Sequence, residues 1–382
     1  MVITNGNEIV DAYTNGVKVI EIYANGVKVW PVYTPSPANN EIYYTSTDWN
    51  IVTPNTDSMP SGLNIVSNTY TPGIGGVIVF DNDISKVWYN MFGSAYSATE
   101  LRPKHTLETV VLPSSITEIA ANAFMDCDNL VSVNIPNGVT KIGSWAFRGC
   151  WSLNSLTIPA STVDITDDAF FGTSLQSLTV DSGNTVYDSR NNCNAIIETS
   201  TNTLIAGCDT TIIPSTVAKI GERAFIRHER MTSITIPSNV TTIDFEAFAG
   251  CIGLTQISLP GVTVLHKSAF KSCTGLVSVD MPVIQDLGGG TYLNNVGPFE
   301  GCTSLTTVTI PQSVIYIRDR AFYKCTSLSE VIVYRTNPPY MAGNEVFNDN
   351  AVGRLIKVPS GSVQAYKTAS GWSTYAADIV SQ

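Results

Sequence analysis

The 382-residue chain has little charge. Charged residues make up only 14 % of it, well below the roughly one quarter of an average globular protein. Those present are mostly acidic, so the net charge is −11. No run of Lys and Arg forms a basic stripe, and an acidic surface repels phosphate backbones. The composition therefore argues against nucleic-acid binding.

Long apolar runs are also missing. Eighteen consecutive apolar residues occur nowhere, so we expect no membrane-spanning helix. The first residues, MVITNGNEIVDAY, carry neither a basic stretch nor a continuous apolar stretch. We therefore expect no signal peptide in this sequence.

Histidine is scarce as well. His105, His228 and His266 are the three in the chain, and none has a Cys or carboxylate partner at a motif spacing. Residues 288–290 are Gly-Gly-Gly without the GKS or GKT of a phosphate loop. Residues 81–83 begin like a calcium loop but lack its later Gly and Glu. We predict a non-enzymatic protein with no catalytic residue, no metal site and no cofactor.

What the chain does have is a repeat centred on phenylalanine. Ten units are recognisable, mostly 22 or 23 residues apart. A fixed period of this length predicts a solenoid, in which stacking makes the core continuous. The clearest units carry Phe124, Phe147, Phe225, Phe248, Phe270, Phe299 and Phe322, and weaker ones carry Phe92, Phe170 and Phe347.

Each unit combines a strand with a turn. Leu130-x-x-Val133-x-Ile135 alternates apolar and polar residues like a strand with one buried face, and Pro136 ends it. An apolar pair three residues apart follows, and then a short turn of helix that holds the next Ala-Phe. We predict a mixed β/α solenoid over residues 77–359, with short parallel strands and short helical turns.

These units resemble the BspA-type, or treponemal-type, leucine-rich repeat family of bacterial surface proteins and some protozoan ones. The resemblance covers residues 77–360 and recurs in all ten units. It implies a surface recognition or adhesion protein. The chain departs from the commonest leucine-rich consensus by placing Pro where an asparagine ladder would begin, so we expect no such ladder.

Six cysteines occupy one repeat position. Zinc requires four ligands converging on one point, whereas these thiols occur once per coil. If the coils are spaced like packed helices, about 8–10 Å apart, the thiols are too far apart for the roughly 7 Å limit of a disulfide. We predict buried, reduced thiols that act as small hydrophobic groups: Cys127, Cys150, Cys251, Cys273, Cys302 and Cys325.

The other two cysteines lie in an insertion at about residues 183–210. The insertion reads as a hairpin in which Thr199 faces Asn202, and the same register places Cys193 opposite Cys208. The sequence leaves two alternatives open, a cross-strand disulfide or two half-buried thiols.

Both ends of the chain differ from the repeat. Asn-Gly recurs at residues 5, 15 and 25 between alternating apolar runs, which predicts an antiparallel β meander over residues 1–33. A sheet this small buries no core of its own, so its apolar residues must pack on a partner chain or fold back on this one. They are Val17, Val19, Ile22, Val29 and Trp30. We further predict a linker at 34–40, an N-terminal cap at 41–76 and a C-terminal cap at 360–382.

Candidate binding residues are sought in the irregular segments. The outward strand positions hold short uncharged polar residues, and almost none of the Trp, Tyr or Arg anchors typical of interfaces. Loops on a rigid scaffold concentrate binding residues. Our candidates are Tyr89, Tyr96, Tyr187, Arg190 and Tyr292.

Two functions remain. The segment YTNGVKVIEIYANGVKVWP resembles the N-terminal segments of some phage tail or fibre proteins. That resemblance implies a virion adhesion protein of a phage of gut-type bacteria, joined to other virion proteins or to itself as an oligomer through the meander. The alternative is a bacterial cell-surface adhesin that binds host or matrix proteins. The expected partner is in either case a protein or surface-glycan receptor.

Overall fold

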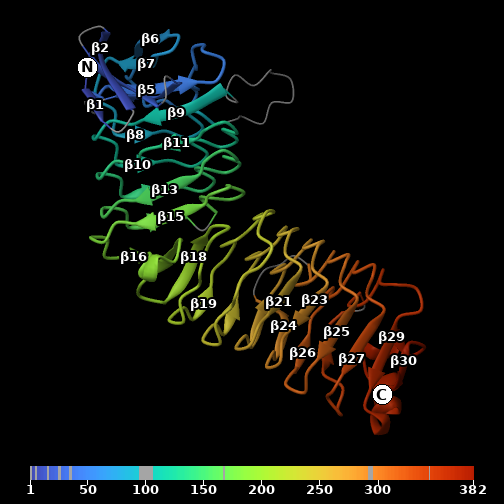
Figure 1. Cartoon of the computed structure of the whole chain (residues 1–382). Coiled ribbons are helices and arrows are strands. Elements are labelled where there is room, and N and C mark those ends of the chain that lie inside the picture. The colour runs from blue at the N-terminus through green and yellow to red at the C-terminus, as the bar shows by residue number, and fades with distance from the viewer. Residues whose placement is uncertain are drawn as a thin grey trace.

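The computed structural model describes residues 2–4, 7–14, 17–24, 27–33, 37–93, 106–166, 168–290, 296–343 and 345–382. The repeat forms a column of stacked coils that runs from the N-terminal to the C-terminal end (Figure 1). Each regular coil contributes a strand to a front sheet, a shorter strand to a side sheet, and a turn that carries the phenylalanine. The predicted repeat solenoid is therefore confirmed.

The front sheet contains the strands that end near the repeat proline. Where neighbouring strands pair, they do so in parallel and in register, so that Leu156 lies beside Leu178 and Val308 beside Val331. The front strands are β9 (Leu107–Val111), β11 (Ser132–Val133), β13 (Ser155–Ile158), β15 (Ser177–Val180), β21 (Gln256–Ser258), β23 (Ser278–Asp280), β25 (Thr307–Ile310), β27 (Glu330–Val333), β29 (Leu355–Val358) and β30 (Ile379–Ser381).

The side sheet is built from the apolar pair that follows the proline. Its strands are short because only one buried residue per coil, such as Ile119 or Ile142, faces the core. They are β8 (Lys86–Val87), β10 (Glu118–Ile119), β12 (Lys141–Ile142), β14 (Asp164–Ile165), β19 (Lys219–Ile220), β20 (Thr242–Ile243), β22 (Val264–His266), β24 (Asp286–Gly289), β26 (Tyr316–Ile317) and β28 (Tyr340–Met341).

The expected helical turn around each phenylalanine is instead a series of hydrogen-bonded turns. Asn122 and Asp126, two residues before and after Phe124, have φ of 59° and 57°. A right-handed helix cannot contain left-handed residues four apart. The turns also join the coils, because the Phe124 N–H donates to the Ala146 carbonyl (2.8 Å) and the Phe147 N–H to the Ala169 carbonyl (2.9 Å).

These backbone hydrogen bonds between successive phenylalanine turns bring the coils close together. The rings of Phe225 and Phe248 stack with centroids 4.9 Å apart, and those of Phe248 and Phe270 lie 5.0 Å apart, nearly parallel. The coils on this side of the column are therefore closer together than the 8–10 Å that we expected from packed helices. Small alanines make the close approach possible, because the residue before each phenylalanine is buried against the neighbouring backbone.

The insertion forms the predicted hairpin, but the hairpin lies inside the column. It comprises β16 (Tyr187–Asp188), the 3-10 turn η2 (Arg190–Asn192), β17 (Ala195–Glu198) and β18 (Thr203–Gly207). β17 and β18 pair antiparallel, and β18 continues in parallel into β19. Figure 1 shows the column changing direction at β16–β19.

The hairpin separates two hydrophobic cores. Ile196 and Cys208 pack into the first core, which reaches from Ile42 to Cys208. Ile197 and Cys193 pack into the second, which reaches to Ile379. Successive residues of a strand point to opposite faces, so this one strand closes the first core and opens the second.

The disulfide between Cys193 and Cys208 is excluded, and both cysteines are free and buried. A register shift between Ile196 and Ile197 places Ala195 beside Gly207, which moves Cys193 out of line with Cys208. The two thiols then face different cores.

The first strands form a four-stranded antiparallel sheet. Its order is β1-β2-β3-β4, and Ile22 pairs with Trp30 across β3 and β4. The strands are β1 (Val2–Thr4), β2 (Asn7–Thr14), β3 (Val17–Ala24) and β4 (Val27–Tyr33). The meander is thus present, and what its apolar residues pack against remains a prediction.

Both ends of the column are covered. At the N-terminal end β5 (Glu41–Ser46), β6 (Ile65–Thr71) and β7 (Gly75–Phe80) extend the front sheet, with β5 antiparallel to β9. At the C-terminal end η3 (Ser360–Ser362), α1 (Val363–Thr368) and η4 (Trp372–Tyr375) precede β30. Trp372 is fully buried against Phe347 and Tyr366. No helix in the described part of the chain has the length and hydropathy of a membrane span.

Candidate functional site

The front strands form four separately paired groups, β9 with β11, β13 with β15, β21 with β23, and β25 with β27, β29 and β30. The widest break lies in the middle of the column. β21 pairs only with β23, and β13 only with β15. Residues 232–236, at the equivalent position of the coil between them, are extended but belong to no strand. The same coil is paired on the side sheet, where β20 lies between β19 and β22. The column is therefore closed at the side and open at the front of this coil.

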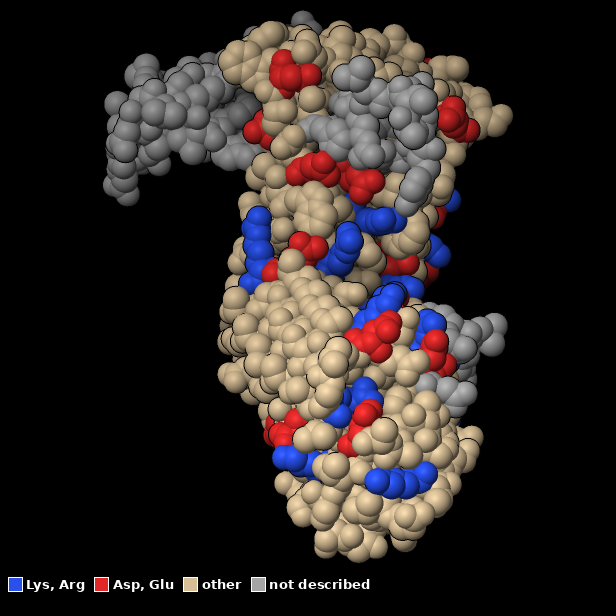
Figure 2. Space-filling view, turned by 90° about the vertical axis from the view of Figure 1, so that its right-hand side faces the viewer, with Lys and Arg blue, Asp and Glu red and all other residues tan. Residues whose placement is uncertain are grey.

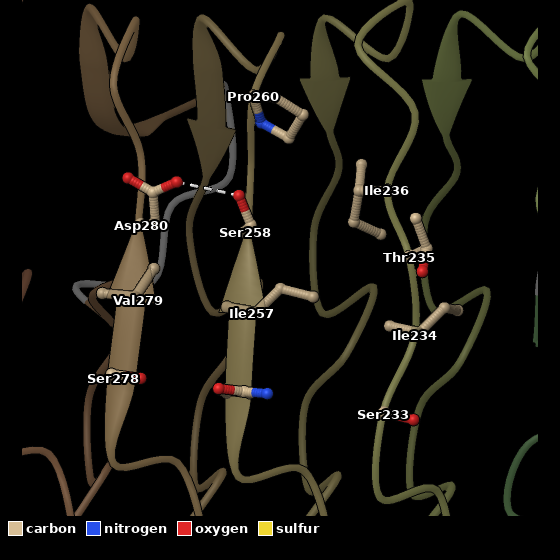
Figure 3. A pocket seen from close by; sticks show the side chains of 11 residues that line it. Ser233, Ile234, Thr235, Ile236, Ile257, Ser258, Pro260, Ser278, Val279 and Asp280 are labelled. Atoms are coloured by element: carbon tan, nitrogen blue, oxygen red, sulfur yellow. Dashed lines mark hydrogen bonds between the residues drawn. The ribbon is translucent and has the colours of Figure 1, made fainter.

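A groove of about 540 Å³ lies at the interruption. Ser233, Ile234, Thr235 and Ile236 form one wall, and residues of β21 and β23 form the other (Figure 3). The hydroxyls of Ser233 and Thr235 are exposed at the rim, whereas Ile257 below them is only 4 % exposed. The groove thus combines an apolar floor with a polar rim.

One carboxylate supplies the only charge among the residues that line the groove. Asp280 ends β23, and its Oδ2 accepts a hydrogen bond from the Ser258 hydroxyl at 2.8 Å (Figure 3). No Lys or Arg is among the lining residues. The groove is therefore weakly acidic, and no histidine or cysteine is present in it as a nucleophile or base.

One face of the molecule carries no broad field of charge of one sign (Figure 2). On the face shown in Figure 2, acidic and basic side chains lie next to each other between wide neutral areas. Adjacent coils pair such charges, as in Lys86–Glu118 (2.6 Å) and Lys141–Asp164 (2.8 Å). Exposed pairs of this kind contribute little to stability.

The six cysteines at one repeat position form a column through the stacked coils, which we call the cysteine column. The sequence predicted its burial but not its hydrogen bonds. The six thiols are buried and free, as predicted, but they also act as donors. Each donates to the carbonyl of the phenylalanine one coil back, for example Cys273 to Phe248 (3.0 Å) and Cys325 to Phe299 (3.1 Å). A thiol therefore fills a small apolar space and also supplies a hydrogen bond that alanine lacks.

Burial makes these thiols unreactive. It raises the pKa of Cys273 and of Cys325 to about 12. It also holds the pKa of Cys150, Cys251 and Cys302 well above its usual value. Because the thiolate is the nucleophile, a raised pKa leaves almost no reactive form at neutral pH.

We expect native protein at about pH 8 to react with Ellman's reagent at none of its eight buried cysteines. All eight should react in concentrated guanidinium chloride, which exposes them and restores their ordinary pKa. The absorbance of the released thionitrobenzoate counts the accessible thiols. Rapid modification of a cysteine of the column in the native protein would contradict the packing that we describe.

Two of the predicted binding residues lie in the hairpin of the insertion. Tyr187 is only 6 % exposed, and its hydroxyl accepts a hydrogen bond from the Ile165 N–H at 3.2 Å. Arg190 donates to Asp188 (2.8 Å) and to Asn202 (2.8 Å). Tyr187 is therefore part of the core, and its prediction as a binding anchor was wrong. The Arg190 side chain keeps 25 % of its surface exposed, so Arg190 stays a candidate. The hairpin was expected to be displayed as a loop. Instead its strand β18 pairs with β19 of the side sheet.

The remaining candidates have different outcomes. Tyr89 is 50 % exposed, and its hydroxyl accepts a hydrogen bond from the Asn122 amide at 3.2 Å, so it stays a candidate. Tyr96 and Tyr292 lie outside the described residues. The groove residues Thr235, Ser258 and Asp280 were identified in the sequence as outward positions and were interpreted as ordinary solvated strand residues. Their pattern is the same in every coil, so it does not reveal where the sheet is open.

The sequence also missed an aromatic pair on the side sheet. Tyr316 and Tyr340 are 40 % and 61 % exposed, and their ring centroids lie 6.1 Å apart. The guanidinium of Arg318 lies 4.6 Å from the centre of the Tyr316 ring and pairs with Asp286 at 2.7 Å. Both tyrosines occupy the outward position of a two-residue strand, which only the register of β26 and β28 makes evident.

The described residues hold no cluster of three His, Cys, Asp or Glu side chains placed for a metal ion. The fold defines a leucine-rich repeat solenoid with a groove on its front. A family model described as "BspA type Leucine rich repeat region (6 copies)" matches residues 102–202, 202–295 and 295–366. The chain belongs to this family. The model describes a repeat region rather than a catalytic domain.

Solved structures with similar folds come from several bacteria. The pneumococcal vaccine antigen PcpA aligns with a TM-score of 0.51 and 15 % identity, over 100 % of this chain and 96 % of its own. A leucine-rich repeat protein from Eubacterium ventriosum has a TM-score of 0.43 and 21 % identity, over 63 % and 82 %. A leucine rich cell surface protein from Faecalibacterium prausnitzii has 0.41 and 19 %, over 89 % and 98 %. No curated protein matches significantly.

Proposed function

We propose that the chain is a bacterial cell-surface recognition protein that binds another protein through the front groove. The observation that carries this proposal is the groove beside residues 233–236, where the backbone belongs to no strand and the side chain of Ile234 is only half-buried. Membership of a BspA-type family supports the surface location. The chain is an adhesin in this proposal, with the repeat as scaffold and no catalytic role.

The virion role is carried only by the resemblance of the first residues to phage tail or fibre segments. The family match begins at residue 102 and lends that role no support. The surface adhesin, which was the alternative from sequence, is therefore our main proposal. Attachment or oligomerisation through the meander stays a proposal for either role.

The proposal is tested by blocking the groove with a bulky side chain. We expect Thr235→Trp to abolish binding of the full chain to a matrix protein that the unmodified chain binds, because the indole covers the rim of the groove. Thr235 is exposed, so the change costs little stability. Immobilised fibronectin, fibrinogen, laminin and collagen serve as candidates, and surface plasmon resonance measures the binding.

The matched control is Thr157→Trp, which places the same ring at the equivalent exposed position of β13. Binding should survive in this variant. Equal loss in both variants would place the contact elsewhere on the front sheet. Retained binding in the Thr235 variant would exclude the groove as the recognition site.

A further inference from the structure

Resting on the proposed function, we infer that the groove binds its partner by strand addition: an extended segment of the partner pairs with the open edges of the front sheet. The segment alternates apolar and basic residues. The proposal rests on the backbone of residues 233–236 and of β21, and on the side chains beside them.

The first wall is an extended segment without backbone partners. The N–H and C=O groups of Ser233, Ile234, Thr235 and Ile236 make no hydrogen bond to another segment of the described chain. In the coil of β13, by contrast, the equivalent residue Ser155 pairs with Ser177 of the next coil. A row of unpaired backbone donors and acceptors is a template for an added strand.

The second wall is the free edge of β21. Gln256 and Ser258 lie beside Ser278 and Asp280 of β23 on one side, and no strand pairs on the other. Residues along a parallel strand direct their backbone groups alternately to the two edges. Part of the β21 backbone therefore faces the groove. An added strand would pair with this edge of β21.

The floor selects an apolar residue. Ile257 and Val279 are buried, at 4 % and 8 % exposure, whereas Ile234, at the same repeat position, is only half-buried. The missing neighbour strand leaves this side chain uncovered. A strand laid in the groove directs every second side chain toward the floor, so an apolar residue there would cover Ile234.

The rim selects a basic residue. One carboxylate oxygen of Asp280 is bonded to Ser258, and no Lys or Arg lines the groove to neutralise that charge. A lysine or arginine on the outward face of the added strand would reach it. No aromatic ring lines the groove as a stacking platform, so a sugar is the less suitable occupant.

The test uses three fluorescein-labelled hexapeptides and the full chain. The probe alternates valine and lysine, one control replaces the lysines by glutamates, and the other carries N-methyl groups at alternate peptide bonds. We expect the probe to bind and both controls to bind about tenfold more weakly or worse, because one loses the charge match and the other loses backbone hydrogen bonds. Fluorescence anisotropy measures the three affinities.

Two variants and hydrogen exchange locate the site. Asp280→Lys should reverse the preference in favour of the glutamate peptide, and the matched Thr157→Lys, at the equivalent position of β13, should not. The bound probe should slow amide exchange in residues 233–236 and 256–258. Strand addition is overturned if the N-methylated peptide binds as well as the probe, if protection falls elsewhere, or if no peptide binds. The Thr235→Trp result decides separately whether the groove is a recognition site.

Discussion

Replacing Phe248 by alanine is expected to lower the free energy of unfolding by about 3–5 kcal/mol. Its ring is fully buried and stacked on both sides, with centroids 4.9 Å from Phe225 and 5.0 Å from Phe270. The backbone on this side is held by its own ladder, since the Phe248 N–H donates to the Ala269 carbonyl at 2.7 Å. The coils cannot close over the cavity, so most of the lost contact remains lost. Urea unfolding followed by circular dichroism measures the change.

Tyr334→Ala is the matched control. This ring lies at the end of a front strand and is 55 % exposed, so its loss should cost less than about 0.5 kcal/mol. In a solenoid each coil contacts mainly its neighbours. Amide exchange should therefore rise first in the coils of Phe225 and Phe270. A loss in the Phe248 variant no larger than in the control would contradict a continuous, rigid phenylalanine stack.

The second large effect is expected at the hairpin. Ile196 and Ile197 are adjacent and both fully buried, so replacing either with alanine should cost about 2–5 kcal/mol. Their side chains enter different cores. We expect Ile196→Ala to loosen the coils on the N-terminal side of the hairpin and Ile197→Ala to loosen those on the C-terminal side.

Each variant is the control for the other, because the substitution is identical and the positions are consecutive. Hydrogen exchange detected by mass spectrometry should show faster exchange around Leu156 and Leu178 for Ile196→Ala. It should show faster exchange around Ile220 and Ile243 for Ile197→Ala. The same exchange pattern in both variants would mean that the hairpin does not separate two cores.

Much of the fold follows from local sequence. Spacing predicted the solenoid, since phenylalanine at a fixed interval must meet its counterparts when coils stack. Alternation in segments such as Leu130 to Ile135 predicted the front strands. The burial of the cysteines followed from their single repeat position, and the structure confirms them as free thiols.

Other features were not predictable in this way. The sequence indicated helical turns around Phe124. In the structure Asn122 and Asp126 have left-handed backbone conformations, which a right-handed helix does not contain. It treated the cysteine thiols as apolar, whereas their orientation makes each one a donor to the preceding coil. It interpreted Tyr187 as a display residue, whereas the hairpin that carries it pairs with the side sheet.

The sequence by itself determined which residues face the core, because the periods of strand and coil are local properties of the chain. Only the tertiary structure decided where the column bends and where the front sheet opens. The bend lies at the inserted hairpin, whose two faces belong to different cores. Similar short polar residues occupy most outward positions, and Ser233 and Ser155 are the same residue at the same repeat position. They differ only in whether a neighbouring strand is close enough to pair.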